Sequence, residues 1–177
     1  MDFGCNESLL PVQLASLGYD VSGVDLLHYA YRHPAFRFQQ RNLVGAFQSE
    51  AFDGITSVSV VEHIGLGCYG EEVVARTTDV EVMEELYRIL KTNGLLILTI
   101  PFGRKFTGSQ YRVYDQKGVE ELLSKFAVEN VEFYRRSDKL YWMPCDRDEM
   151  KDLPSGEEPD NASRSVNGVM CIKARKR

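Results

Sequence analysis

Residues 1–26 read "MDFGCNESLLPVQLASLGYDVSGVDL". An acid stands two residues before Gly4, a helical pattern runs over Leu9–Leu17, and the apolar run Tyr19–Asp25 ends in a second acid. In α/β proteins, a glycine turn between a strand and a helix, followed about 20 residues later by an acid, holds a ribose. The stretch therefore predicts a nucleotide-like ligand at the carboxyl ends of parallel strands.

The residues after Gly4 narrow the class of ligand. A dinucleotide site needs further glycines so that the backbone can approach a pyrophosphate, but here the chain continues with Cys5, Asn6, Glu7 and Ser8. The carboxylate of Glu7 would also repel phosphates. NAD and FAD are thus disfavoured. S-adenosyl-L-methionine has no phosphate and carries a sulfonium cation, so acids around it are favourable.

The rest of the chain alternates between apolar runs and helical patterns, which is typical of an α/β domain with a mainly parallel sheet. We expect further strands at Phe36–Gln40, Phe52–Ser59, Leu95–Phe102, Val128–Tyr134 and Val169–Ala174, the last two antiparallel neighbours. The continuous apolar pattern of Leu95–Phe102 is typical of a strand covered on both faces.

Two longer helices are predicted between these strands. The first spans about Glu72–Leu90 and is stopped by Asn93-Gly94. Its apolar face follows three- and four-residue steps and comprises Val80, Met83, Leu86, Tyr87 and Leu90. The second runs from an Asp115 cap to about Phe126.

The predicted architecture is one Rossmann-like α/β domain over residues 1–177, mostly parallel with an antiparallel C-terminal strand, and with a long polar loop at about 144–167. A central strand should precede Asp2, but only Met1 is available for it. We therefore expect the first strand to be largely missing. Either the chain is truncated at its N-terminus relative to a longer parent, or another segment or subunit fills the gap.

Composition argues against several classes of function. The net charge of −5 disfavours nucleic-acid binding, and no apolar run approaches the roughly 20 residues of a membrane span. The four cysteines lie far apart without a CxxC pair, so we expect neither a metal site nor a disulfide framework, and a cytoplasmic location. The oligomeric state stays open.

Three stretches in order carry a family resemblance. "DFGCNES" with "LASLGYDVSGVDL" resembles motif I and the following acid of the class I S-adenosylmethionine-dependent methyltransferases. "FDGITSVSVVEHI" is similar to their fourth strand, and "ELYRILKTNGLLILTIPFG" to their next helix, turn and fifth strand. The resemblance extends to about Phe133. "EHIGLGCYGE" also resembles a subgroup with members associated with glycan or cell-surface biosynthesis.

The resemblance implies S-adenosyl-L-methionine as cofactor and assigns residues to it. Asp2 would lie near its methionine end, where the backbone of Gly4, Cys5 and Asn6 would approach it. On the ribose and adenine side, the implied contacts are Asp25 to the ribose hydroxyls, Leu26 against the adenine face and Asn42 at the adenine edge. Ser59 and Val60 would close the remaining side.

Methyl transfer requires a positioned nucleophile and sometimes a base that removes its proton. An unperturbed imidazole, which titrates near pH ~6.5, suits this role, so His63, with Glu62 beside it, is the candidate. The alternatives are a histidine that fixes the loop by a hydrogen bond and a glutamate that acts only as a cap or loop acid. The acceptor pocket is expected near Tyr69, Arg104, Tyr111 and Tyr114.

The sequence thus favours a methyltransferase acting on a small-molecule or glycan-related acceptor. Because Asn6 and Ser8 replace glycines of motif I, a non-catalytic or degenerate methyltransferase-fold binding protein is the main alternative. An NAD-dependent oxidoreductase is a third interpretation.

Overall fold

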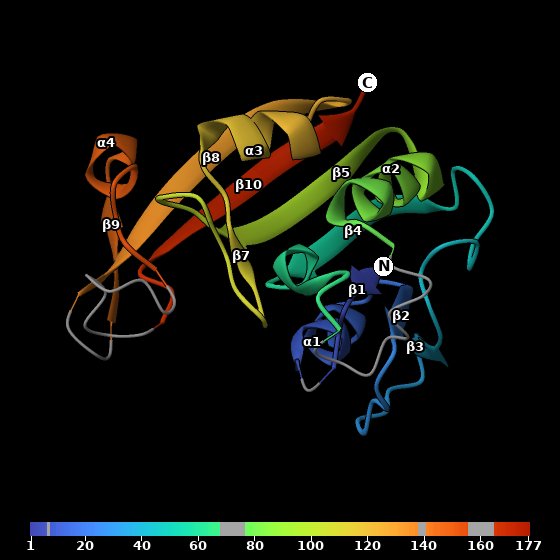
Figure 1. Ribbon diagram of the computed structural model, residues 1–177. Coiled ribbons are helices and arrows are strands. Elements are labelled where there is room, and N and C mark those ends of the chain that lie inside the picture. Colours follow the sequence, from blue (N-terminus) through green and yellow to red (C-terminus); the bar gives the residue numbers. More distant parts are fainter. Residues whose placement is uncertain (7, 68–76, 138–140, 156–164) are drawn as a thin grey trace.

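The computed structural model describes residues 1–6, 8–67, 77–137, 141–155 and 165–177 (Figure 1). Eight strands form one sheet in the order β3-β2-β1-β4-β5-β10-β8-β9. Their bounds are β1 Asp2–Phe3, β2 Val21–Asp25, β3 Phe36–Gln40, β4 Phe52–Val58, β5 Leu90–Pro101, β8 Phe126–Ser137, β9 Tyr141–Cys145 and β10 Gly168–Lys176. A separate two-stranded hairpin comprises β6 Phe106–Thr107 and β7 Arg112–Val113.

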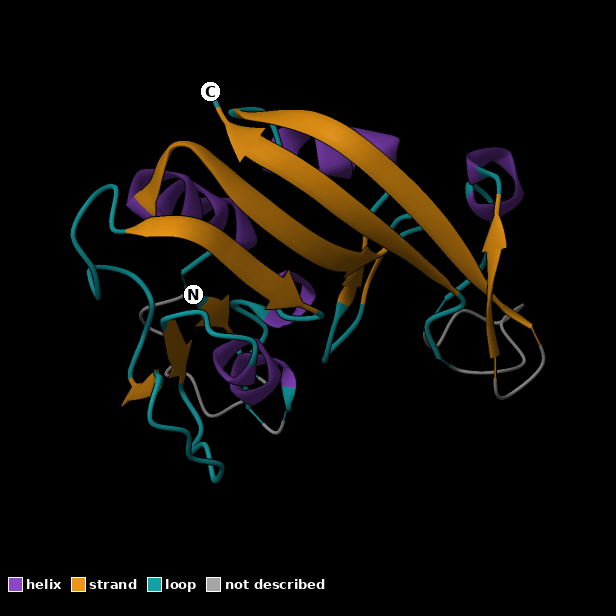
Figure 2. Cartoon of the chain, turned by 180° about the vertical axis from the view of Figure 1, so that it is seen from behind, coloured by secondary structure: helices purple, strands orange, loops and turns teal. Residues whose placement is uncertain are grey.

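The helices are short and few within the described residues. They are α1 Leu10–Ser16, the 3-10 helix η1 Val61–His63, α2 Asp79–Ile89, α3 Gln116–Leu122 and α4 Arg147–Met150. None of them is long and apolar enough to cross a membrane. Figure 2 shows that the helices are short compared with the long strands β5, β8 and β10.

The strand directions confirm the predicted sheet. The β1–β2, β2–β3, β1–β4 and β4–β5 pairs are all parallel. The C-terminal strand β10 inserts antiparallel between β5 and β8, and β9 adds a further antiparallel strand at the edge. The sequence did not predict β9.

The central strand β1 has two residues, Asp2 and Phe3, between β2 and β4. Met1 extends its contact with β4, since its amino group donates to the Gly54 carbonyl at 2.8 Å and its own carbonyl accepts from the Thr56 amide at 2.9 Å. The expected first strand is therefore short but occupies the predicted central position.

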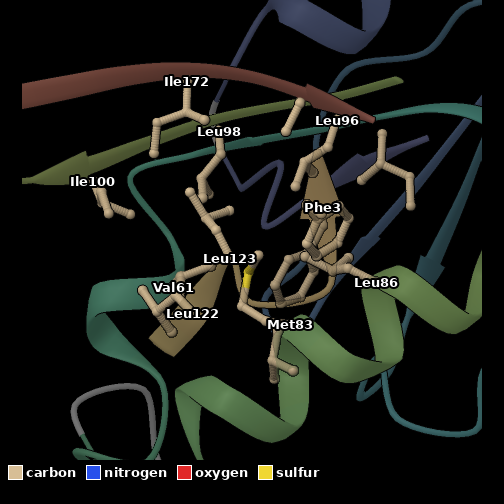
Figure 3. Packing of buried hydrophobic residues seen from close by; sticks show 14 of the residues in the cluster. Phe3, Val61, Met83, Leu86, Leu96, Leu98, Ile100, Leu122, Leu123 and Ile172 are labelled. Carbon is tan, nitrogen blue, oxygen red and sulfur yellow. The ribbon is translucent and has the colours of Figure 1, made fainter. Parts of the chain in front are cut away.

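The main core lies between the sheet and the pair α2 and α3 (Figure 3). Met83 and Leu86 of α2 and Leu122 of α3 are buried there. They share this core with sheet residues from several strands: Phe3, Leu96, Leu98, Ile100 and Ile172. The apolar strand predicted from "LLILTIPF" alternates in burial, because Leu95 and Ile97 on its other face are only half-buried. Coverage on both faces is thus incomplete.

The predicted apolar face of the first long helix needs correction. Helix α2 begins at Asp79. Thr78 caps it, because the side chains of Thr78 and Glu81 each accept a hydrogen bond from the backbone amide of the other residue. Residues 72–76 of the predicted helix lie outside the described part of the chain. Val80 is 43% exposed, whereas Val82 is 2% exposed. Met83, Leu86 and Leu90 of the predicted face are buried as expected, so the correction is confined to Val80, and Val82 lies on the buried face in its place.

Asn93-Gly94 does not end this helix. Strand β5 already begins at Leu90, and Asn93 has a φ of +61° within it. The pairing of β4 with β5 shifts there, from Phe52 opposite Leu90 to Gly54 opposite Leu95. The sequence predicted a turn correctly, but it forms an irregularity inside a strand.

Two further boundaries differ from the sequence expectation. Helix α3 ends at Leu122, and Phe126 is already the first residue of β8. The segment predicted as a polar loop at 144–167 contains the end of β9 and the one-turn helix α4, whose Met150 is fully buried. Residues 156–164 of that segment lie outside the described residues.

Candidate functional site

A cavity of about 300 Å³ opens at the carboxyl ends of β1, β2 and β4. Its polar lining residues are Asn6, Ser8, Asp25, Ser59 and His63. Its other lining residues are Phe3, Gly4, Cys5, Leu26, Leu27, Val58, Val60 and Ile64. The parallel strands β2 and β3 lie on one side of β1 and β4 and β5 on the other, so the order of the strands reverses at β1, and open α/β sheets bind ligands at such a point.

The turn after β1 brings backbone close to the opposite wall of this cavity. Gly4 has a φ of +73°, and a Cβ built on it would lie 2.3 Å and 2.5 Å from the two methyl carbons of Val60. Its amide donates to the Val24 carbonyl at 2.9 Å. Only glycine satisfies both the conformation and the space at this position.

Asp25 lies where the sequence placed it, at the end of β2 and in the cavity lining. One carboxylate oxygen accepts from the Asn6 amide and the other from the Leu27 amide, both at 2.8 Å. Asp25 thus stabilises two turns at once. Each carboxylate oxygen can accept a second hydrogen bond, so the residue retains capacity for a ligand hydroxyl.

Asp2 lies beneath the cavity and is not part of its lining. Its carboxylate accepts a 2.5 Å hydrogen bond from the Thr56 hydroxyl. Burial raises the pKa of Asp2 to about 6, although Thr56 and the N-terminal amino group oppose this rise. Cys5 is also buried, and burial raises the pKa of its thiol to about 12, so the thiol stays protonated at neutral pH.

Ser59, Val60 and Leu26 line the cavity as expected, but Asn42 does not. Ser59 adopts a φ of +54°, and its amide donates to the Thr99 hydroxyl at 3.0 Å. Asn42 is exposed, and its side-chain oxygen accepts from the Val44 amide at 2.9 Å. That local turn explains the asparagine without a ligand.

Glu62 and His63 both belong to η1, immediately after the cavity wall formed by Ser59 and Val60. Glu62 is 2% exposed, and its Oε2 atom has no hydrogen-bond partner among the described residues. Burial raises the pKa of this carboxyl to about 8, which its own backbone and Ser59 oppose. Its Oε1 lies 3.9 Å from His63 Nε2.

His63 lines the cavity, and its Nδ1 lies 2.5 Å from the carbonyl oxygen of Gln110. His63 therefore makes the loop-fixing hydrogen bond that the sequence analysis gave as the alternative to a catalytic base, and it also faces the cavity. The sequence did not single out Gln110. It contributes through its main chain, which no side-chain pattern reveals.

The expected acceptor-pocket residues do not converge on this cavity. Arg104 donates to the Asp152 carbonyl at 3.1 Å, and the Tyr114 hydroxyl donates to Asp79 at 2.8 Å. Neither they nor Tyr111 are among the cavity-lining residues. Tyr69 belongs to residues 68–76, outside the described part of the chain.

Solved structures share this fold at low sequence identity. One is a 1,6-didemethyltoxoflavin-N1-methyltransferase of Burkholderia thailandensis with bound 1,6-didemethyltoxoflavin and S-adenosylhomocysteine: TM-score 0.64, 14% identity, covering 99% of this chain and 69% of that one. The N-methyltransferase NodS of Bradyrhizobium japonicum, in complex with S-adenosylhomocysteine, gives a TM-score of 0.59 at 11% identity, covering 99% and 76%. The chain thus has the class I methyltransferase fold.

A third solved structure, the [4+2]-cyclase SpnF, has a TM-score of 0.60 at 12% identity, covering 99% of this chain and 73% of that one. A fold shared with a cyclase does not by itself specify methyl transfer. No curated protein matches the chain significantly. A family profile does match residues 31–140, more than half of the chain. The chain therefore belongs to the family described as Caenorhabditis protein of unknown function, DUF268.

Proposed function

We propose that the protein is an S-adenosylmethionine-dependent methyltransferase that acts on a small-molecule or glycan-related acceptor. The observation that carries the proposal is the position of Asp25, a carboxylate at the rim of the cavity and at the end of β2. A carboxylate there can accept hydrogen bonds from both hydroxyls of a ribose.

The charge of the cavity supports this cofactor over a dinucleotide. Among the described residues that line it, Asp25 is the one carboxylate, and none is lysine or arginine. Such a lining suits a ligand that carries a sulfonium cation and disfavours a pyrophosphate, which needs donors or positive charge around it. Leu26 and Leu27 beside Asp25 provide the apolar surface that an adenine ring requires.

The residues fit a division of roles in the reaction. The cofactor would supply an activated methyl group, and Asp25 and the turn at Gly4 would hold its ribose and its methionine end. His63 would remove a proton from the acceptor, since its imidazole faces the same cavity. The two N-methyltransferases with this fold support nitrogen among the accepting atoms.

Calorimetric titration of S-adenosylhomocysteine tests the proposal. Wild type should bind it. Asp25→Asn, which keeps the size of the side chain but removes its charge, should bind about tenfold to a hundredfold more weakly, because a hydrogen bond to a charged group contributes roughly 1.5–3 kcal/mol. Asp20→Asn is the matched control, because Asp20 is exposed, precedes the amino end of β2 and pairs with Arg37.

The same titration separates the alternatives. Binding of NADH instead of S-adenosylhomocysteine would favour an oxidoreductase. Binding of neither ligand to folded wild type would indicate a degenerate site. Equal affinities of wild type and Asp25→Asn would overturn the role of Asp25. Thermal unfolding of each variant without ligand shows whether a loss of binding reflects a loss of folding.

A further inference from the structure

The β6–β7 hairpin, residues 106–113, lies against η1 and contacts the candidate base from outside the cavity. Phe106 pairs with Val113 and Thr107 with Arg112, and the Gly108 amide donates to the Tyr111 carbonyl at 3.0 Å. Gln110 therefore belongs to the tight turn of this hairpin. None of these residues lines the cavity, so their effect on it must pass through residues that do, His63 and the neighbouring Ile64.

The contact between Gln110 and His63 determines where the imidazole carries its proton. A carbonyl oxygen accepts hydrogen bonds and cannot donate them. With Nδ1 at 2.5 Å from the Gln110 oxygen, Nδ1 must hold the hydrogen. In the neutral ring the proton-accepting atom is then Nε2. The contact thus selects one of the two tautomers.

Arg112 fastens the hairpin to η1 on either side of His63. Its guanidinium donates to the Ile64 carbonyl at 2.6 Å and to the Glu62 carbonyl at 3.4 Å. These are the residues that flank His63 in the chain, and Gln110 stands two residues before Arg112. The Arg112 side chain therefore fixes the position of Gln110 relative to His63, the two partners of the hydrogen bond.

The Arg112 side chain is itself held in place. It is 20% exposed, and its Nε lies 3.7 Å from Oδ2 of Asp79, which also accepts from the Tyr114 hydroxyl. Asp79 is the first residue of α2. The charge of Arg112 is thus compensated at the start of a core helix, which makes it a fixed anchor and not a mobile surface cation.

We propose that Arg112 is a positioning residue: through the Gln110 carbonyl it selects the Nδ1–H tautomer of His63 and leaves Nε2 as the proton-accepting atom. The importance of this positioning for catalysis rests on the proposed methyltransferase function. The tautomer itself does not, because it follows from the contact between the Gln110 carbonyl and Nδ1.

Nitrogen-15 NMR of the imidazole rings tests this directly, without cofactor or acceptor. At alkaline pH, wild-type His63 should show a pyrrole-type Nδ1 and a pyridine-type Nε2, whereas a free imidazole in water prefers the opposite tautomer. The chain has three histidines, and the resonances lost in His63→Gln identify His63. A wild-type His63 in the Nε2–H form would overturn the proposal before any further variant is made.

Arg112→Met should shift His63 towards the Nε2–H form, because the variant keeps the aliphatic stem but removes the donors to Glu62 and Ile64. Lys105→Met is the matched control: it removes an exposed cation just before β6 and should leave the His63 resonances unchanged. If Arg112→Met is unstable because it exposes the charge of Asp79, Arg112→Met with Asp79→Asn removes both charges. An unchanged tautomer in a folded variant would overturn the role of Arg112.

Binding of S-adenosylhomocysteine provides the independent check. Arg112→Met should bind it within about twofold of wild type, because Arg112 is not part of the cavity lining and its hydrogen bond to the lining residue Ile64 goes to the main-chain carbonyl. If wild type fails to bind it but shows the Nδ1–H tautomer, the proposed function fails and the positioning role of Arg112 stands. If wild type binds it but His63 is in the Nε2–H form, the positioning role of Arg112 fails and the proposed function stands.

Discussion

At Gly4 both the backbone conformation and the space beside Val60 require a glycine. Gly4→Ala should lower the free energy of unfolding by about 1–2 kcal/mol for the left-handed backbone and by a further roughly 1–3 kcal/mol for overpacking against Val60. Urea denaturation measures the sum. The φ of +73° and the contacts of 2.3 Å and 2.5 Å are the physical reasons.

Gly45 provides the control for this prediction. It has the same φ of +73°, but a Cβ built on it meets nothing within 4 Å. Gly45→Ala should therefore show only the backbone cost. Adding Val60→Ala to Gly4→Ala should restore part of the stability. If Gly4→Ala and Gly45→Ala are equally destabilised, the close approach to Val60 is not a constraint.

Glu62 should make stability depend on pH. Its pKa is raised from 4.5 to about 8 by burial, so the folded state keeps its proton at pH values where the unfolded state has lost it. The resulting stability is complete below pH ~4.5 and is lost as the pH rises through about 8, with a slope of at most about 1.4 kcal/mol per pH unit.

Glu62→Gln removes this titration. The variant should be close to wild type in stability at about pH 5 and more stable than wild type at about pH 8, because it cannot acquire a buried charge. Urea denaturation across this range checks the prediction. Asp2, whose pKa is raised to about 6, titrates in both proteins and cancels in the difference. Parallel stability curves would show that Glu62 ionises normally.

At the scale of the element, α2 offers a test of whether Val82 or Val80 belongs to the face that packs on the sheet. Val82→Ala should cost about 1.5–3 kcal/mol, because it removes fully buried methyl groups. Val80→Ala should stay within about 0.5 kcal/mol of wild type, as at most surface positions. Thermal or urea unfolding separates the two, and equal costs would contradict the burial of Val82 beside the exposed Val80.

The β6–β7 hairpin is the element near the candidate site that sequence reasoning missed. Its strands have two residues each, too few for an alternating pattern, and it reaches η1 through the Gln110 carbonyl and the Arg112 guanidinium. Contacts made through main-chain atoms across 47 residues of sequence leave no signature in composition or spacing.

At the scale of the whole molecule, the sheet order explains why the site lies at one end of the fold. Strands β1, β2 and β4 are parallel, so their carboxyl ends meet at one edge and bring together Gly4, Asp25 and Ser59. The strands beyond β5 extend the sheet away from this edge (Figure 1). The cavity thus depends on the first 60 or so residues, and the later strands complete the core beneath it.

The sequence by itself determined the α/β class, the central place of the first strand and the positions of Asp25, Ser59 and His63 at or shortly after strand ends. These follow from local properties: hydrophobic period, glycine and acid spacing, and the rule that parallel strands end on the same edge. Tertiary structure alone decided that Val82 and not Val80 lies on the buried face of α2, that Asp2 lies beneath the cavity and that Asn42 lies outside it. It also decided that a distant carbonyl orients His63. Each of these depends on which surfaces meet in space, and several arrangements satisfy the same local pattern.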